Sequence, residues 1–169
     1  MNLNDLVLYG TTGVCTVASI ENKKIGRVTR KYYVLKPISQ STATVFVPAD
    51  NNELLSKVRR ILTLDEINEL LKLLLDKENI WYDNDNERKV KYSEIVSSGD
   101  RLSCLVLLRT LQFKQKELVG KGKRLHIVDE RFLKEAQRLI YDEFSIVMKK
   151  PIDEVDSFIK NEFKACEKI

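Results

Sequence analysis

Residues 43–74 read ATVFVPADNNELLSKVRRILTLDEINELLKLL and contain the change of pattern that decides the fold class. Before Pro48 the residues are mostly β-branched or aromatic, which is typical of a strand. After Thr63, leucine and isoleucine recur every three or four positions, which predicts a helix with one apolar face that extends to about Glu78. Thr63, with Glu66 three positions later, also fits a capping box. The chain therefore changes from strands to helices within this stretch.

Towards the N-terminus, the sequence predicts further short strands. The predicted strands are Leu6–Tyr9, Val14–Ile20, Tyr32–Leu35 and Ala43–Val47. The polar and basic segment Glu21–Arg30, which contains Gly26, is predicted as a connection. Four or five short strands in about fifty residues are too few for two packed sheets, so we predict a small, strongly curved barrel of the SH3 or Tudor type.

Towards the C-terminus, the apolar period stays near that of a helix. Asn79–Asn86 is a polar and acidic interruption that carries Ile80, Trp81 and Tyr82, and it is predicted as a loop. Further helices are predicted from Val90, after a break at Ser98-Gly99-Asp100, from Asp129 after the basic turn at 120–124, and from Pro151. The predicted fold class is therefore α+β, with a small SH3/Tudor-like β-barrel at residues 1–62 and an all-α helical domain at residues 63–169.

The overall charge of +4 on 169 residues conceals an uneven distribution. Residues 1–62 carry a net charge of +5, residues 63–87 of −6, residues 88–150 of +7 and residues 151–169 of −2. Two basic blocks are compatible with contact to nucleic acid, and ordinary solvated surfaces are the alternative. No window approaches the roughly 18 apolar residues of a membrane span, and the first residues lack a secretory pattern, so we expect a cytoplasmic protein with no membrane contact.

Residues that could carry catalysis are few. His126 is the only histidine, and a surface or helix-cap position is expected for it. Cys15, Cys104 and Cys166 are far apart in sequence, so we expect buried or incidental thiols. No phosphate-binding loop, nucleophile elbow or dinucleotide fingerprint is present. The sequence therefore predicts no enzyme, no metal site and no cofactor.

The order of short motifs along the chain is more informative. In the N-terminal half they are Asp5-Leu6-Val7-Leu8-Tyr9, Gly13-Val14, Ile20-Glu21, Tyr33-Val34-Leu35-Lys36 and Val45-Phe46-Val47-Pro48. In the C-terminal half they are Trp81, Arg88, Tyr92, Ser98-Gly99-Asp100, Leu105, Leu108-Arg109-Thr110-Leu111, Lys121-Gly122-Lys123, Asp129-Glu130-Arg131 and Glu143-Phe144. Over nearly the whole chain, this order resembles the CarD/CdnL family of bacterial transcription regulators.

The resemblance implies a monomeric, nucleoid-associated regulator whose N-terminal domain binds the β subunit of RNA polymerase. In the family, one strand of this domain extends a sheet of the β subunit. The residues expected to bind polymerase here are Lys23, Thr44, Val45 and Phe46. Relatives often carry arginine at the position of Phe46, so an apolar contact would replace an ionic one, and Lys23, Lys24 or Arg27 would supply charge. The alternative is that Phe46 is an ordinary aromatic residue of the barrel core.

The resemblance also implies that the helical domain binds promoter DNA at the upstream edge of the melted bubble and stabilises the open complex. Trp81 would act as a wedge in the minor groove, and Arg88, Lys89 and Lys91 would neutralise phosphates with little sequence specificity. The alternative for Trp81 is packing into a core between the domains.

Two other classes of function remain open from the residues alone. They are a free-standing architectural DNA-binding protein and a Tudor-like adaptor between proteins. The same small domain occurs in the transcription-repair coupling factor, but 169 residues without a Walker A motif leave no room for that protein's motor.

Overall fold

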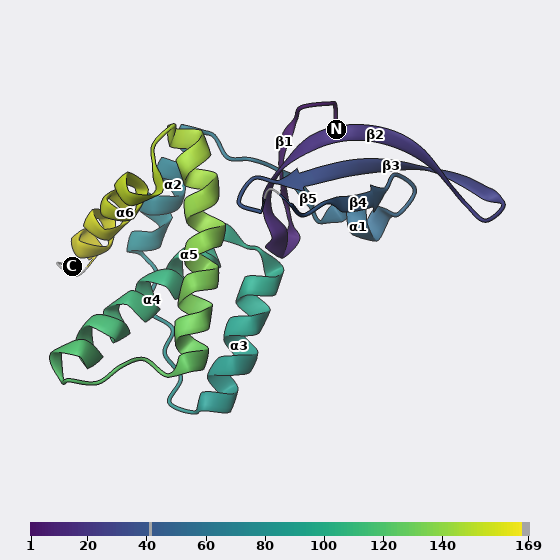
Figure 1. Ribbon diagram of the computed structural model, residues 1–169. Coiled ribbons are helices and arrows are strands. Elements are labelled where there is room, and N and C mark those ends of the chain that lie inside the picture. The colour runs from purple at the N-terminus through teal and green to yellow at the C-terminus, as the bar shows by residue number, and fades with distance from the viewer. Residues whose placement is uncertain (41, 167–169) are drawn as a thin grey trace. The chain divides into compact units, whose positions relative to one another are not determined.

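The computed structural model describes residues 1–40 and 42–166 and divides the chain into two compact units. The N-terminal unit comprises Met1–Ile61, and the helical unit begins at Leu62. The first unit is built on an antiparallel sheet and the second is all-helical (Figure 1). The predicted α+β class is therefore confirmed.

The sheet of the N-terminal unit has five strands in the order β4-β3-β2-β1-β5. The strands are β1 (Leu6–Tyr9), β2 (Gly13–Ile25), β3 (Val28–Pro37), β4 (Val45–Pro48) and β5 (Val58–Arg60); a 3-10 turn η1 (Gly10–Thr12) follows β1, and a short helix α1 (Asn52–Ser56) follows β4. The long strands β2 and β3 curve strongly (Figure 1). The sequence did not predict α1 and β5, because elements of five and three residues are too short to express a period.

The core of this unit lies on one face of the sheet. Val7, Cys15, Val17, Leu35 and Val47 form its buried centre and come from four strands. Leu8, Val14 and Val34, which are neighbours of these residues along the strands, are buried as well, so burial near the core is not confined to alternate positions. Burial of each aliphatic side chain contributes about 1.5–3 kcal/mol to folding, so the cluster stabilises the sheet.

The segment Glu21–Arg30, predicted as a connection, is instead the distal half of the β2–β3 hairpin. The strand pairing continues outward to Ile25 opposite Val28, and a tight turn joins the strands. Gly26 occupies that turn with φ +65°, a conformation that glycine adopts without a steric penalty. The prediction was wrong because both faces of this ribbon are exposed to solvent, so its sequence lacks the alternation that marks a half-buried strand.

Within the described residues, the helical unit contains five helices. They are α2 (Leu64–Leu75), α3 (Asp85–Ser98), α4 (Arg101–Gly120), α5 (Ile127–Met148) and α6 (Ile152–Cys166). None of the helices in the described part of the chain is long and apolar enough to cross a membrane.

The predicted helix signals are largely confirmed by the caps. Thr63 and Glu66 form a reciprocal capping box at the start of α2. Gly99, in the left-handed conformation, ends α3, and the Asp100 carboxylate accepts the Ser103 N–H to begin α4. His126 is an exposed N-cap of α5, as expected from its isolation in the sequence.

Two helix boundaries differ from the prediction for identifiable reasons. Helix α2 ends at Leu75 instead of about Glu78, because the guanidinium of Arg109 on α4 donates to the carbonyls of Leu74 and Lys77. Helix α3 begins well before Val90, because its first turn is polar and carries no apolar stripe that would identify it. In both cases the deciding information was absent from the local apolar pattern.

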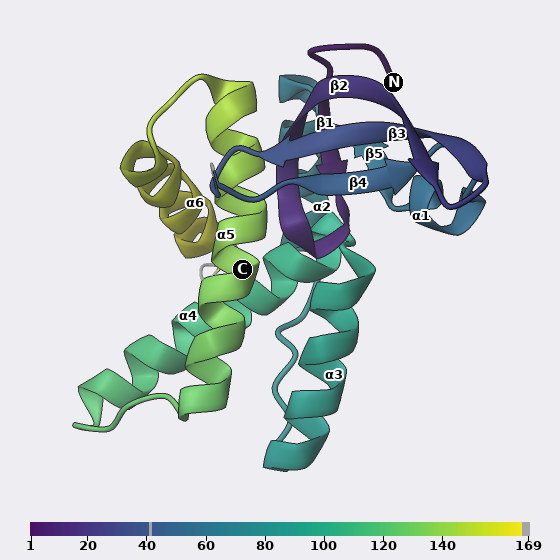
Figure 2. The same cartoon turned by 45° about the vertical axis from the view of Figure 1, so that its right-hand side comes forward.

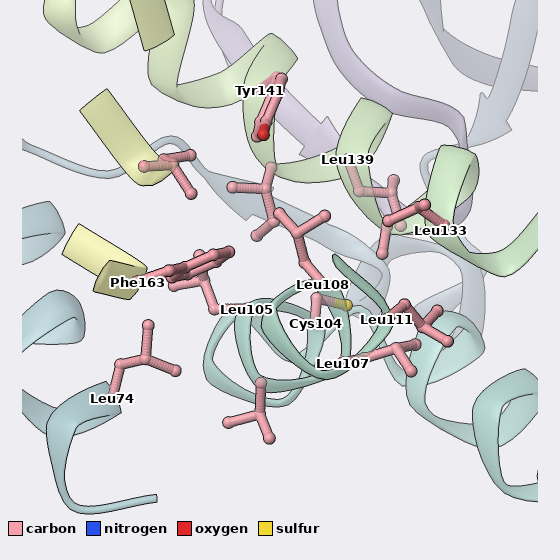
Figure 3. Packing of buried hydrophobic residues seen from close by; sticks show 14 of the residues in the cluster. Leu74, Cys104, Leu105, Leu107, Leu108, Leu111, Leu133, Leu139, Tyr141 and Phe163 are labelled. Carbon is pink, nitrogen blue, oxygen red and sulfur yellow. The ribbon is translucent and has the colours of Figure 1, made fainter. Parts of the chain in front are cut away.

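Helix α4 is the centre of the helical unit and packs against α2, α3 and α5. The sequence predicted one buried stripe, but every residue from Cys104 to Leu111 is buried. Figure 3 shows Leu105, Leu107, Leu108 and Leu111 around this helix, with Leu74 of α2, Leu133, Leu139 and Tyr141 of α5, and Phe163 of α6 in the same cluster. A helical segment surrounded by other helices buries all of its faces. A prediction based on one apolar stripe therefore gives too few buried residues.

Glu143 is a buried charged residue of this core whose partners are well defined. The Glu143 carboxylate, 1% exposed, accepts two hydrogen bonds from Arg101 at 2.7 Å and one from the Leu62 N–H at 2.9 Å. Because both of its oxygens are satisfied, a buried charge is tolerated here. This arrangement fixes the first residue of the helical unit to α5.

Cys15 and Cys104 are buried thiols that are not joined in a disulfide, as expected for incidental cysteines. Burial raises the pKa of the Cys15 thiol to about 11, which keeps it protonated and unreactive near neutral pH. The side chain of Cys166 lies outside the described part of the chain.

Candidate functional site

Strand β4 lies at one edge of the sheet, next to β3 (Figure 2). The Ala49 N–H donates to the Lys31 carbonyl at 2.8 Å, which fixes the hydrogen-bonding phase of the antiparallel ladder. Hydrogen-bonded pairs alternate along such a ladder, so the main-chain groups of Val47 and Val45 face β3. Those of Phe46 therefore point away from the sheet, towards the open edge.

Pro48 fits this alternation. It lies two residues after Phe46 and shares its outward phase, so its missing N–H removes no bond from the β3–β4 ladder. Proline also blunts this end of the edge against unwanted pairing with other strands. The groups available for an added strand are consequently centred on Phe46 and on the exposed Thr44 just before β4.

The Phe46 side chain lies on the outer face of the sheet and is 43% exposed. Its ring packs edge-on against Tyr32 with a centroid distance of 6.5 Å, and the Lys23 Nζ lies 3.5 Å from the ring centroid. Phe46 is thus not a residue of the barrel core. The structure brings together two of the residues predicted to bind polymerase, because β2 and β4 both flank β3.

The other two residues of that set differ in exposure. Thr44 is exposed, whereas Val45 is half-buried and packs against the core of the unit. Lys24 and Arg27, considered as additional sources of charge, are exposed on the distal half of the β2–β3 hairpin. The outer surface near β4 therefore combines one open strand edge, one exposed aromatic ring and several cations.

In the helical unit, Trp81 lies in the loop between α2 and α3 and is half-buried against the core. The guanidinium carbon of Arg88 lies 4.4 Å from its ring centroid, and the Lys114 Nζ lies 4.9 Å from it. Cations at such distances are attracted to the π face of an indole. Trp81 is therefore neither fully exposed nor enclosed.

The main chain on either side of Trp81 is fixed by hydrogen bonds. The Ile80 N–H donates to the Thr110 Oγ1 at 3.0 Å, and the Tyr92 hydroxyl donates to the Ile80 carbonyl at 2.8 Å. Arg88 donates to the Tyr82 and Asp83 carbonyls at 2.7 and 3.1 Å. The predicted loop Asn79–Asn86 is therefore irregular from Asn79 to Asn84, whereas its last two residues belong to α3, and it is anchored at several points.

Arg88 is 5% exposed, whereas a direct phosphate ligand needs an accessible guanidinium. It pairs with the buried Asp129 of α5 and with Asp85 of its own helix. Burial alone opposes its charge, but hydrogen bonds and attraction from Asp129 and Asp85 outweigh this effect and raise the pKa of Arg88. The structure thus corrects the expected surface position of Arg88.

Lys89 and Lys91, the other residues predicted to bind phosphate, are exposed on α3. Lys91 forms an ion pair with Glu94 at 3.5 Å. Lys114 was not predicted, because its place on the indole depends on the packing of α4 and not on its sequence neighbours. The Arg88–Asp129 pair brings the first turns of α3 and α5 together, and Trp81 contacts Arg88 and Lys114 next to this pair.

Residues 1–61 match the family model described as the CarD-like/TRCF RID domain. The N-terminal unit is a CarD-like RNA polymerase-interacting domain. Such a domain implies binding to the polymerase β subunit and points to a transcription regulator. No curated protein matches the chain.

The match ends where the helical unit begins. It therefore covers β4, Phe46 and Lys23, but not Trp81 or the cations around it. CarD-like proteins are in general not enzymes, whereas the same domain in TRCF is part of a helicase.

Proposed function

We propose that this protein docks on the RNA polymerase β subunit through the edge of β4 and stabilises the open promoter complex by contacting DNA with its helical unit. The single observation that carries the proposal is the polymerase-interacting domain at residues 1–61, with β4 at the edge of its sheet. The nucleic-acid contact is supported separately by the aromatic residue and the cations that contact it in the helical unit.

Docking through β4 would add a strand of the polymerase to the sheet. Main-chain hydrogen bonds from the outward groups of Phe46 and Thr44 would provide affinity that depends little on side chains. The exposed Phe46 ring, with Lys23 on its face, would provide specificity, because aromatic and cationic residues are frequent anchors at interfaces. Val45 would contribute indirectly, because its packing against the core holds β4 in position.

The contact with DNA would centre on Trp81. An indole can enter a distorted base step at the edge of a melted region, where unstacking costs only a few kcal/mol. Lys89, Lys91 and Lys114 lie on the helices next to it and would neutralise phosphates, with little preference for sequence. Arg88 is left out of this set because all of its guanidinium is engaged inside the unit.

The regulatory effect would come from differential binding. A factor shifts an equilibrium only by as much as it prefers one state, so the protein would bind the open complex more tightly than the closed complex. Docking on polymerase would raise the effective concentration of a weak DNA-binding unit near the promoter, without requiring the protein to bind DNA strongly by itself.

The lifetime of the open complex after addition of a competitor tests this proposal. The wild-type protein should lengthen the lifetime on several promoters, and Trp81→Ala should lose most of that effect while still co-purifying with polymerase. Lys134→Gln, on the exposed surface of α5, is a suitable control. An unchanged lifetime with Trp81→Ala would contradict the wedge, and tight duplex binding without polymerase would favour a free-standing architectural protein.

A further inference from the structure

Trp81 lies between two cations that are held in very different ways. Arg88 comes from the first turn of α3, and Lys114 comes from the second half of α4. The distances from the ring centroid, 4.4 and 4.9 Å, are similar. The bonding of the two side chains decides which of them can leave the indole.

The Arg88 guanidinium is fixed in place by its hydrogen bonds. Its Nε donates to one oxygen of Asp129 at 3.2 Å, and one terminal nitrogen donates to the Tyr82 and Asp83 carbonyls. The other terminal nitrogen donates to the second Asp129 oxygen at 3.1 Å and to Asp85. A guanidinium has five N–H donors, and these five hydrogen bonds use all of them.

Asp129 is the residue that fixes this arrangement. It lies in the first turn of α5, is 3% exposed, and accepts from two different nitrogens of Arg88. A carboxylate that receives two parallel N–H bonds sets both the position and the plane of the guanidinium. Because that guanidinium also holds two carbonyls of the loop, Asp129 controls the loop that carries Trp81 from a helix distant in sequence.

Lys114 is held less firmly than Arg88, by the Trp81 ring and by a pair with an exposed carboxylate. Its side chain is 26% exposed, and its Nζ pairs with Glu117 at 3.0 Å. Glu117 also pairs with Lys121 at 2.6 Å, so it keeps a cationic partner if Lys114 moves away. A flexible lysine in such a pair exchanges partners at little cost, unlike a buried arginine with every donor engaged.

We infer that Asp129 acts through Arg88 as the positioning residue for Trp81, and that Lys114 is an exchangeable cover on the indole. When a DNA phosphate approaches, the Lys114 ammonium would move from the ring and Glu117 to the phosphate. One part of the indole would then become free to meet a base step, while Arg88 keeps the loop in place. This inference rests on the proposed DNA contact, which it extends by separating a fixed cation from a mobile one.

The free protein provides a direct test, because Trp81 is the only tryptophan of the chain and its fluorescence reports on one site. Lys114→Gln should increase quenching by acrylamide by about twofold, since a neutral side chain is no longer attracted to the ring. Lys114→Arg should restore quenching to near the wild-type level. Lys134→Gln, which breaks an exposed ion pair elsewhere, should leave it unchanged.

Asp129→Asn tests the positioning role by removing the charge and keeping the shape. The near-ultraviolet circular dichroism of Trp81 should weaken, while the far-ultraviolet spectrum retains its helical signal. If this variant does not fold, Arg88→Lys takes its place in the same measurement, because lysine keeps the charge but cannot form the paired N–H bonds to Asp129. If quenching in Lys114→Gln were unchanged, the claim that Lys114 covers the indole would be refuted. If the tryptophan signal of folded Asp129→Asn were unchanged, the claim that Asp129 positions Trp81 would be refuted.

The two levels of the proposal can fail separately. If the fluorescence changes occur as expected but Trp81→Ala leaves the open-complex lifetime unchanged, the arrangement of the two cations holds and the DNA function fails. If Trp81→Ala shortens the lifetime but Lys114→Gln and Asp129→Asn leave the tryptophan signals unchanged, the DNA function holds and this inference is refuted.

Discussion

Replacement of Phe46 by proline tests whether the open edge of β4 is the docking surface. The Phe46 N–H points away from β3, so proline removes this donor without removing a hydrogen bond of the sheet, as Pro48 already does two residues later. Phe46→Ala is the matched variant, since it removes the ring and keeps the N–H. The difference between the two variants isolates the main-chain contact from the side chain.

The magnitude follows from the groups that are lost. Phe46→Ala removes a ring that is 43% exposed and its contact with Lys23, which should weaken polymerase binding by about 1–2 kcal/mol. Phe46→Pro in addition leaves an acceptor of the partner strand unpaired, at a cost of about 1–3 kcal/mol. We therefore expect the affinity of the proline variant to be about 5–150-fold lower than that of the alanine variant.

The assay is a biolayer interferometry titration of the full chain against an immobilised fragment of the β subunit. Thermal unfolding of each variant serves as the control for folding, because Phe46 lies outside the buried core of the N-terminal unit. Equal affinities for the proline and alanine variants would refute the claim that the Phe46 N–H joins a partner strand. If both variants bound the β subunit with wild-type affinity, β4 would not be part of the interface.

Three further predictions concern the helical unit. Glu143→Gln should lower the free energy of unfolding by about 2–4 kcal/mol in urea titrations, because it leaves a guanidinium without its charged partner, whereas the exposed Glu154→Gln should change it by less than about 0.5 kcal/mol. Burial raises the pKa of Tyr141 from 10.0 to about 12, so its contribution to stability is complete below pH 10 and should be lost as the pH rises towards 12; thermal melts across that range would contradict this if the melting temperature did not fall. If Lys89 and Lys91 each contact one phosphate, Lys→Gln at either position should reduce the slope of log affinity against log salt by about 0.9, and an unchanged slope would remove that residue from the interface.

Much of the fold could be predicted because its signals are local. The capping box of Thr63 and Glu66 and the left-handed Gly99 each depend on residues within one helical turn. Alternation indicated the strand at Val14–Ile20, and apolar, β-branched or aromatic residues indicated the other strands. The distal β2–β3 hairpin did not, because a ribbon exposed on both faces has no hydrophobic pattern to display.

The candidate site was predictable only in part. The order of motifs led to Trp81, Lys23 and Phe46, and the family match at residues 1–61 agrees with the part that includes the latter two. The burial of Arg88 could not be predicted, because it depends on Asp129, which is 41 positions away in sequence. An arginine in a polar first turn looks like a surface residue until its carboxylate partner is known.

The sequence by itself determined the α+β class, the change from strands to helices after Pro48 and the residue types available for contact with polymerase and DNA. Only the tertiary structure decided that Phe46 faces outward beneath Lys23, that α4 is buried on every side from Cys104 to Leu111, and that Trp81 contacts a buried arginine and a partly exposed lysine. The physical reason is the range of the interactions. Period, caps and turns act over a few residues, whereas the exposure and charge state of a side chain are set by partners that only folding brings within a few ångströms.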